Sequence, residues 1–262
     1  MISLSSHGDV TRLEMSSRRS RLIGYSVNAY LVRGVLVDTG FPSIGAEFAR
    51  FVAERRPRGV LLTHVHEDHA GNVALASRLG LPVGAAPATL DELRRVGPIG
   101  FYRRYTWGSM PPVDIGGSEP FADESLSLIA TPGHSPDHHA VWDAETRTIF
   151  GGDLFLGVRV RVARADEDPR ALVASLRAAA ALQPARLFDA HRGPVRDPAT
   201  TLTAKADWLE ETIAAVERLA AEGLDDTAVR RAVLGREEMA GYFSLGDYSR
   251  TNFVRAVRRR PV

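Results

Sequence analysis

The chain has 262 residues, 44% of them hydrophobic and 25% charged, a balance typical of a globular protein rather than a disordered or fibrous one. Its 33 Lys and Arg residues and 32 Asp and Glu residues give a formal net charge of +1, so no strong overall field favours nucleic acid or a membrane as a partner. Cysteine is absent, which excludes disulfides, thiolate metal sites and cysteine nucleophiles and leaves His and carboxylates as candidate metal ligands.

The N-terminal segment and the apolar runs give no sign of export or membrane insertion. The first residues contain no continuous apolar stretch with a cleavage pattern, and no apolar run approaches the roughly 18 residues of a membrane span. We therefore expect a cytoplasmic protein.

Short apolar runs that end at turns alternate with helical patterns along the first three quarters of the chain. Such runs are typical of strands buried on both faces. In chain order we predict a hairpin over 27–32 and 34–37, a helix over 46–55, a strand over 60–62, helices over 72–79 and 89–95, strands over 126–130, 140–142 and 148–150, a helix over 169–182 that begins at Asp168 and Pro169, and a strand over 186–188.

The last quarter of the chain has only helical patterns. We predict helices over 199–222, 226–234 and 249–258, the first of which ends at Gly223. This change of pattern predicts an α/β domain over 1–197 and a C-terminal helical extension over 198–262. The extension is expected to pack on the α/β part, so the two can count as one domain.

Residues 97–120 are rich in Gly, Pro and aromatic residues and have no clear period. A segment of this kind is either a surface loop or a lid over a site. The sequence leaves both interpretations open.

Seven His and Asp residues directly follow predicted strands. Ligands of open α/β sheets bind beyond the carboxyl ends of strands, so we expect these side chains to gather at one site. Five His and two Asp are too many for one four-coordinate metal ion and suit two ions that share a carboxylate. The residues are His64, His66, Asp68 and His69 after the strand at 60–62, His134 after 126–130, Asp153 after 148–150 and His191 after 186–188.

This pattern resembles the metallo-β-lactamase superfamily. The flanking segments agree with it: V-D-T-G at 37–40, T-P-G-H at 131–134 and G-G-D at 151–153. The resemblance spans residues 28–193. It implies an α/β protein with a four-layer αββα sandwich, which here would carry a C-terminal helical segment, and a metal site at the edge of two packed sheets.

The resemblance also implies a role for each of the seven residues. His64, His66 and His134 would hold one divalent ion, Asp68, His69 and His191 would hold a second, and Asp153 would bridge them. Asp38 would orient the site and His138 would be structural, whereas Glu67 is expected to be solvated or a helix cap and His139 has no assigned role. Zn²⁺ is the expected metal, and Mn²⁺ and Fe²⁺ also suit this ligand set.

The function implied is that of a metallo-hydrolase. Asp68 and Asp153 are its expected catalytic residues, and a hydroxide bound by two metal ions would attack the carbonyl of a small ester, thioester or lactone. The ligand set resembles that of glyoxalase II-type thioesterases and lactonases. The chain lacks a Lys soon after Asp153 that would bind glutathione, and it lacks a lactonase-like Tyr there.

Two other functions fit the same residues. One is a sulfur (persulfide) dioxygenase of the same fold with a single iron, which would leave several of the seven residues idle. The other is a non-catalytic metal-binding protein.

The substrate is expected to be a small molecule with an apolar portion, and neither nucleic acid nor a membrane is an expected partner. Aromatic residues of the 97–120 segment and of the C-terminal part would line its pocket. An alternative role for these residues is to hold the helices to the sandwich, and the sequence does not define the oligomeric state. The candidate pocket residues are Tyr102, Tyr105, Trp107 and Tyr242.

Overall fold

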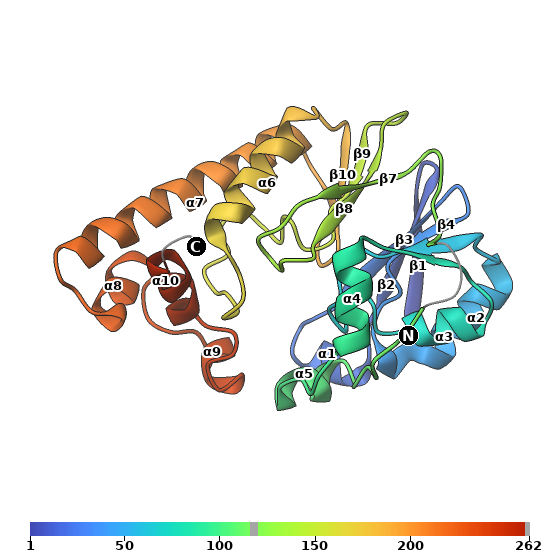
Figure 1. Cartoon of the computed structure of the whole chain (residues 1–262), viewed down its shortest axis with the longest axis horizontal. Coiled ribbons are helices and arrows are strands. Elements are labelled where there is room, and N and C mark those ends of the chain that lie inside the picture. Colours follow the sequence, from blue (N-terminus) through green and yellow to red (C-terminus); the bar gives the residue numbers. More distant parts are fainter. Residues whose placement is uncertain (116–119, 260–262) are drawn as a thin grey trace.

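The computed structural model describes residues 1–115 and 120–259, which form two β-sheets covered by helices (Figure 1). The strands of the first sheet lie in chain order; β1 to β4 are antiparallel, and β4, β5 and β6 are parallel. They are β1 (Ile2–His7), β2 (Val10–Met15), β3 (Val27–Val32), β4 (Val35–Val37), β5 (Gly59–Leu61) and β6 (Val83–Gly84).

The second sheet contains the strands of the second half of the chain, in the order β11-β10-β9-β8-β7. Only β9 and β10 are parallel; the other neighbours are antiparallel. The strands are β7 (Ser127–Ala130), β8 (His139–Asp143), β9 (Thr148–Phe150), β10 (Arg186–Asp189) and β11 (Gly193–Val195).

The helices cover the outer faces of both sheets. Helices α2, α3 and α4 pack on the first sheet, and α6 and α7 pack on the second (Figure 1). The helices are α1 (Arg18–Leu22), the short 3₁₀ helix η1 (Pro42–Ile44), α2 (Gly45–Arg55), α3 (Val73–Arg78), α4 (Pro87–Arg95), α5 (Phe101–Thr106), α6 (Pro169–Ala181), α7 (Pro198–Ala221), α8 (Asp226–Val233), α9 (Met239–Phe243) and α10 (Arg250–Arg258).

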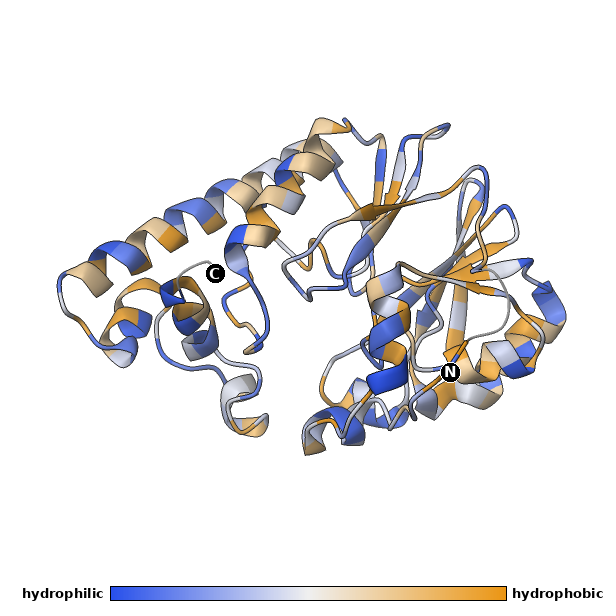
Figure 2. Cartoon of the chain, in the orientation of Figure 1, coloured by the Kyte–Doolittle hydropathy of each residue, from blue (hydrophilic) through white to orange (hydrophobic). Residues whose placement is uncertain are grey.

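Among the described residues, three apolar cores lie between the layers. The core between the sheets includes Tyr30, whose ring centroid is 5.5 Å from that of Phe150 and 5.1 Å from that of Phe188. In Figure 2 hydrophobic residues lie along strands of both sheets, and α6 and α7 have both polar and apolar residues along their length. The predicted αββα sandwich with a C-terminal helical segment is therefore confirmed.

The predicted helices and strands are present, and their ends shift by no more than two residues. Asp168 caps α6 as expected, because its carboxylate accepts the N–H groups of Arg170 and Ala171. The expectation that residues 126–130 are buried on both faces is wrong. Strand β7 is a sheet edge at which Ser127 and Ala130 are exposed.

The 97–120 segment is not simply a surface loop. It contains helix α5, and Trp107, Met110 and Val113 after it are each only 8% exposed and belong to the first core. Residues 116–119 lie outside the described part of the chain.

Within residues 1–115 and 120–259, no helix combines the length and the hydropathy needed to cross a membrane.

Candidate metal centre

The loop after β5 folds back on itself and brings four of the seven residues together. The N–H groups of His69 and Ala70 both donate to the carbonyl of His66, at 2.9 and 2.8 Å. The start of the loop is fixed by Asp38, whose Oδ1 accepts the N–H of Thr63 at 2.8 Å. These bonds turn His64, His66, Asp68 and His69 towards the ends of the two sheets.

A first group of donors consists of three histidines and one carboxylate, all buried. Their ligand atoms lie within 4.8 Å of one another in the set His64, His66, His134 and Asp153. The Nδ1 of His66 is 3.0 Å from the Nε2 of His64 and 3.0 Å from the Nε2 of His134.

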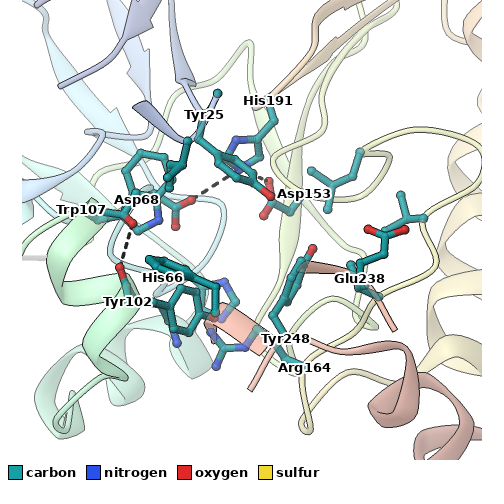
Figure 3. A pocket seen from close by; sticks show the side chains of 18 of the residues that line it. Tyr25, His66, Asp68, Tyr102, Trp107, Asp153, Arg164, His191, Glu238 and Tyr248 are labelled. Carbon is teal, nitrogen blue, oxygen red and sulfur yellow. Dashed lines mark hydrogen bonds and ion pairs between the residues drawn. The ribbon is translucent and has the colours of Figure 1, made fainter. Parts of the chain in front are cut away.

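A second group lies on the other side of Asp153 and consists of Asp68, His69 and His191. The Nε2 of His191 is 3.4 Å from the Oδ2 of Asp68. All seven residues that the sequence singled out therefore lie in two adjoining groups, and Figure 3 shows Asp68, Asp153 and His191 facing one another.

The carboxylate of Asp153 has one oxygen towards each group. Its Oδ2 is 3.2 Å from the Nε2 of His134 in the first group. Its Oδ1 is 3.3 Å from the Nε2 of His69 and 3.4 Å from that of His191 in the second. This orientation is the one that a bridging ligand requires.

The protonation states differ between the two groups. Burial lowers the pKa of His64 and His66 well below the ordinary range and that of His134 to about 4, which keeps these rings neutral. Burial acts in the same direction on His69 and His191, but the carboxylates around them, Asp153 foremost, raise both pKa values well above the ordinary range.

The donor set fits two divalent cations. Neutral imidazoles and carboxylates are the usual ligands of zinc and related ions. Among the described residues, the buried Nε2 of His69 and Oδ1 of Asp153 have no hydrogen-bond partner. Buried polar atoms normally have one, so these two atoms are free to bind an ion.

Other side chains orient the ligands from behind, as is common around bound metals. The Nδ1 of His69 donates to the Oδ2 of Asp38 at 2.8 Å, and the Nδ1 of His191 donates to the carbonyl of Ser26 at 2.8 Å. The position of Asp38 is the one that the resemblance implied.

His138 and His139 belong to neither group. His138 accepts the backbone N–H of Asp153 on its Nε2 at 3.1 Å, so it holds the backbone of the candidate bridging residue. Gly152 leaves room for this contact, because a Cβ there would lie 2.8 Å from the same nitrogen. His139 donates from Nδ1 to the carbonyl of Asp137 at 2.9 Å.

Glu67 is neither solvated nor a cap, contrary to the sequence-based expectation. Its side chain is 3% exposed and forms a two-pronged ion pair with Arg103 of α5, in which the Nε of Arg103 donates to Oε1 at 2.7 Å. The pair connects the metal-ligand loop to the 97–120 segment. The partner is distant in sequence, so no local pattern indicates the pair.

A cavity of about 960 Å³ opens over both groups, between the sandwich and the C-terminal helices (Figure 3). Of the four candidate pocket residues, Tyr102 and Trp107 line it, whereas Tyr105 and Tyr242 do not. Five residues that are not among these candidates also line the cavity: Tyr25, Arg159, Arg161, Arg164 and Tyr248.

Fold and site together define a metal-binding protein of the αββα class. A family model described as the metallo-beta-lactamase superfamily matches residues 22–191. The chain is 26% identical over 206 residues to the beta-lactamase-like protein 2 homolog of Caenorhabditis elegans, a match that covers 70% of this chain and 64% of that protein. It is 29% identical over 179 residues to the thioesterase pkgB of Emericella nidulans, covering 62% of this chain and 47% of that protein.

A solved structure shares the fold over nearly the whole chain. A metallo-beta-lactamase family protein of Thermus thermophilus matches with a TM-score of 0.63 and 20% identity, over 95% of this chain and 91% of that one. The chain belongs to the metallo-beta-lactamase superfamily. It spans between 47% and 64% of the length of the two curated relatives named above.

Proposed function

We propose that the protein is a dinuclear metallo-hydrolase that cleaves a small ester, thioester or lactone. The observation that carries this proposal is the Asp153 carboxylate, which has one oxygen beside each of the two donor groups. A dioxygenase that binds a single iron would use only one donor group, so Asp68, His69 and His191 would hold no ion.

Each of the two donor groups would hold one metal ion. His64, His66 and His134 would hold one ion, Asp68, His69 and His191 the other, and Asp153 both. Zn²⁺ suits these donors best, with Mn²⁺ or Fe²⁺ as alternatives. Two such ions would supply a hydroxide near neutral pH and polarise the carbonyl oxygen of the substrate.

The chain's own residues determine the geometry of the reaction. Asp38 accepts from the Nδ1 of His69, and the carbonyl of Ser26 accepts from the Nδ1 of His191. These bonds fix both rings so that the Nε2 atom of each faces Asp153. The cavity gives a substrate access to the two groups from one side. Trp107, only 8% exposed, lines the cavity next to His191, and the two ring centroids are 6.5 Å apart.

The lining of the cavity favours a substrate with an apolar portion and a negative charge. Tyr25, Tyr102 and Tyr248 offer apolar surface, and Arg159 and Arg161 are exposed at the cavity. Neither arginine has an ion pair among the described residues, so both are free to attract an anionic group. The similarity to a thioesterase supports an acyl thioester as the first substrate to test.

The test is a panel of acyl thioesters, aryl esters and lactones, assayed with metal-loaded protein. We expect turnover of at least one of these classes, its loss in His66→Ala, and its retention in His139→Ala, because His139 lies outside both groups. Oxygen uptake with a persulfide and no hydrolysis would favour the dioxygenase instead. Stable metal binding with neither activity would favour a non-catalytic protein.

A further inference from the structure

Lys205 is the only lysine of the chain, and it is buried. It lies on the apolar stripe of α7 between Leu202 and Leu209 and is 2% exposed. Lysine is almost never fully buried unless its charge is compensated. Its position in the core therefore calls for a specific partner.

The partners of Lys205 are two carbonyls of the loop that carries Asp153. Its Nζ donates to the carbonyl of Leu154 at 3.1 Å and to that of Phe155. The same nitrogen lies 5.9 Å from the centroid of the Phe155 ring. These two residues directly follow the candidate bridging ligand, so helix α7 holds the loop at the point where it leaves the metal centre.

The next residue of this loop has a strained backbone. Leu156 has a φ of +53°, a left-handed conformation that non-glycine residues adopt only when their surroundings impose it. Its N–H donates to the Oδ2 of Asp189 at 2.6 Å, and its carbonyl accepts from Arg192. These contacts on both sides of the Leu156 peptide are what hold the backbone in this conformation.

The anchors also connect the two ligand loops. The Oδ1 of Asp189 accepts the N–H of His191 at 2.8 Å, so one carboxylate binds the loops of both Asp153 and His191. Lys205 and Asp153 also line one small cavity of about 20 Å³ together with His134. The ammonium group is thus adjacent to the metal centre without belonging to either donor group.

We propose that Lys205 is a positioning residue, which fixes the loop after Asp153 so that the carboxylate stays between the two donor groups. Through this contact the C-terminal helix α7 becomes part of the metal centre. The inference rests on the proposed metal function. It differs from a purely structural role, in which Lys205 would stabilise the packing of α7 and leave metal affinity unchanged.

The experiment compares Lys205→Met with wild type and with Arg230→Met. Arg230 is a matched control, since it is a buried cation of the C-terminal helices that donates to the carbonyl of Gly235 and does not line the cavity over the metal centre. Zinc affinity is measured by competition with a chromophoric chelator, and circular dichroism verifies folding. Loss of a group that supports metal ligands typically costs about 10–100-fold in affinity.

We expect zinc affinity to fall by about that factor in Lys205→Met and to stay unchanged in Arg230→Met. Equal affinities in wild type and folded Lys205→Met would overturn the inference and leave the proposed function intact. A wild-type protein that binds neither zinc, manganese nor iron would instead overturn the proposed function.

A second measurement applies if Lys205→Met does not fold. Wild-type protein grown with ¹³C,¹⁵N-labelled lysine gives a single side-chain Nζ signal, because the chain has one lysine. We expect this signal to shift with zinc and to stop shifting when the metal sites are full. A signal that is unaffected by zinc would contradict the inference.

Discussion

Buried charged side chains connect the candidate site to the rest of the protein. Glu67 and Arg103 form one such ion pair, with side chains 3% and 12% exposed. Removing one partner of a buried pair leaves an uncompensated charge, which costs more than the pair itself contributes.

Arg103→Ala is therefore expected to lower the free energy of unfolding by about 3 kcal/mol. Arg104→Ala, at the exposed neighbouring position, should change it by less than about 0.5 kcal/mol. Urea unfolding of both variants checks this, and adding Glu67→Gln to Arg103→Ala should recover part of the loss. If Arg103→Ala and Arg104→Ala change the free energy of unfolding equally, the ion pair of Glu67 and Arg103 contributes nothing to stability.

Lys205 also predicts a pH dependence of stability. Burial lowers its pKa to about 8 from the ordinary 10.5, although Asp189, Glu167 and Asp153 oppose the shift. Between these values the unfolded chain binds more protons than the folded one, so the free energy of unfolding rises with pH in this window. Below about pH 8 both states are protonated and the dependence disappears.

The size of this effect is about 3 kcal/mol at most. We expect it in metal-free wild type and not in Lys205→Met, when urea unfolding is compared at about pH 8 and about pH 10. If the free energy of unfolding changes equally with pH in wild type and in Lys205→Met, the fold does not shift the pKa of Lys205.

At the scale of single residues, the sequence predicts the candidate metal ligands better than the residues that hold those ligands in place. The seven candidate ligands follow strands at short, recognisable spacings, and the structure brings them together. Arg103 and Lys205 gave no signal, because their partners Glu67, Leu154 and Phe155 lie 36 to 51 residues away. Such long-range pairs depend on tertiary packing, which a local pattern does not contain.

At the scale of elements, the segment after α5 is part of the core rather than a free lid. The ring centroid of Trp107 is 4.8 Å from that of Phe41, and its carbonyl accepts both the N–H and the hydroxyl of Ser43, at 3.1 and 2.7 Å. These contacts fix the wall of the cavity to the first sheet.

Trp107→Ala should therefore cost about 3 kcal/mol of stability, the usual size for a large buried aromatic. It should also alter the substrate profile, since Trp107 lines the cavity. Phe101→Ala, at a position 66% exposed, serves as the control and should cost less than about 0.5 kcal/mol. Unchanged stability together with an unchanged profile would remove Trp107 from both roles.

Elements with a strong apolar pattern were predictable, and those without one were not. Strands β4, β5 and β9 are fully buried and read as continuous apolar runs. Strand β1 is mostly exposed and polar, so it shows no pattern, although it pairs with β2 along its whole length. Its strand conformation comes from that pairing.

At the scale of the whole molecule, the C-terminal helices share a core with the second sheet. This core contains Ile149 and Leu187 of the sheet, Leu176 of α6 and Leu209 of α7. The predicted division at residues 197 and 198 falls at the start of α7, so both sides of the division contribute to one core.

A chain that ends at Asp197 is therefore expected to lose cooperative unfolding, because the apolar face of α6 would be exposed to water. Circular dichroism and thermal unfolding measure this directly. A cooperative transition in the shortened chain would show that residues 1–197 are an independent domain.

Metal content per chain is the most direct measurement of the central claim, that the two donor groups hold two ions. Elemental analysis of protein purified without chelator should give about two equivalents of zinc, manganese or iron. His66→Ala should give less, and His139→Ala the same as wild type. Metal near zero that reconstitution does not restore would contradict the account, as would one equivalent of iron with oxygen uptake on persulfides.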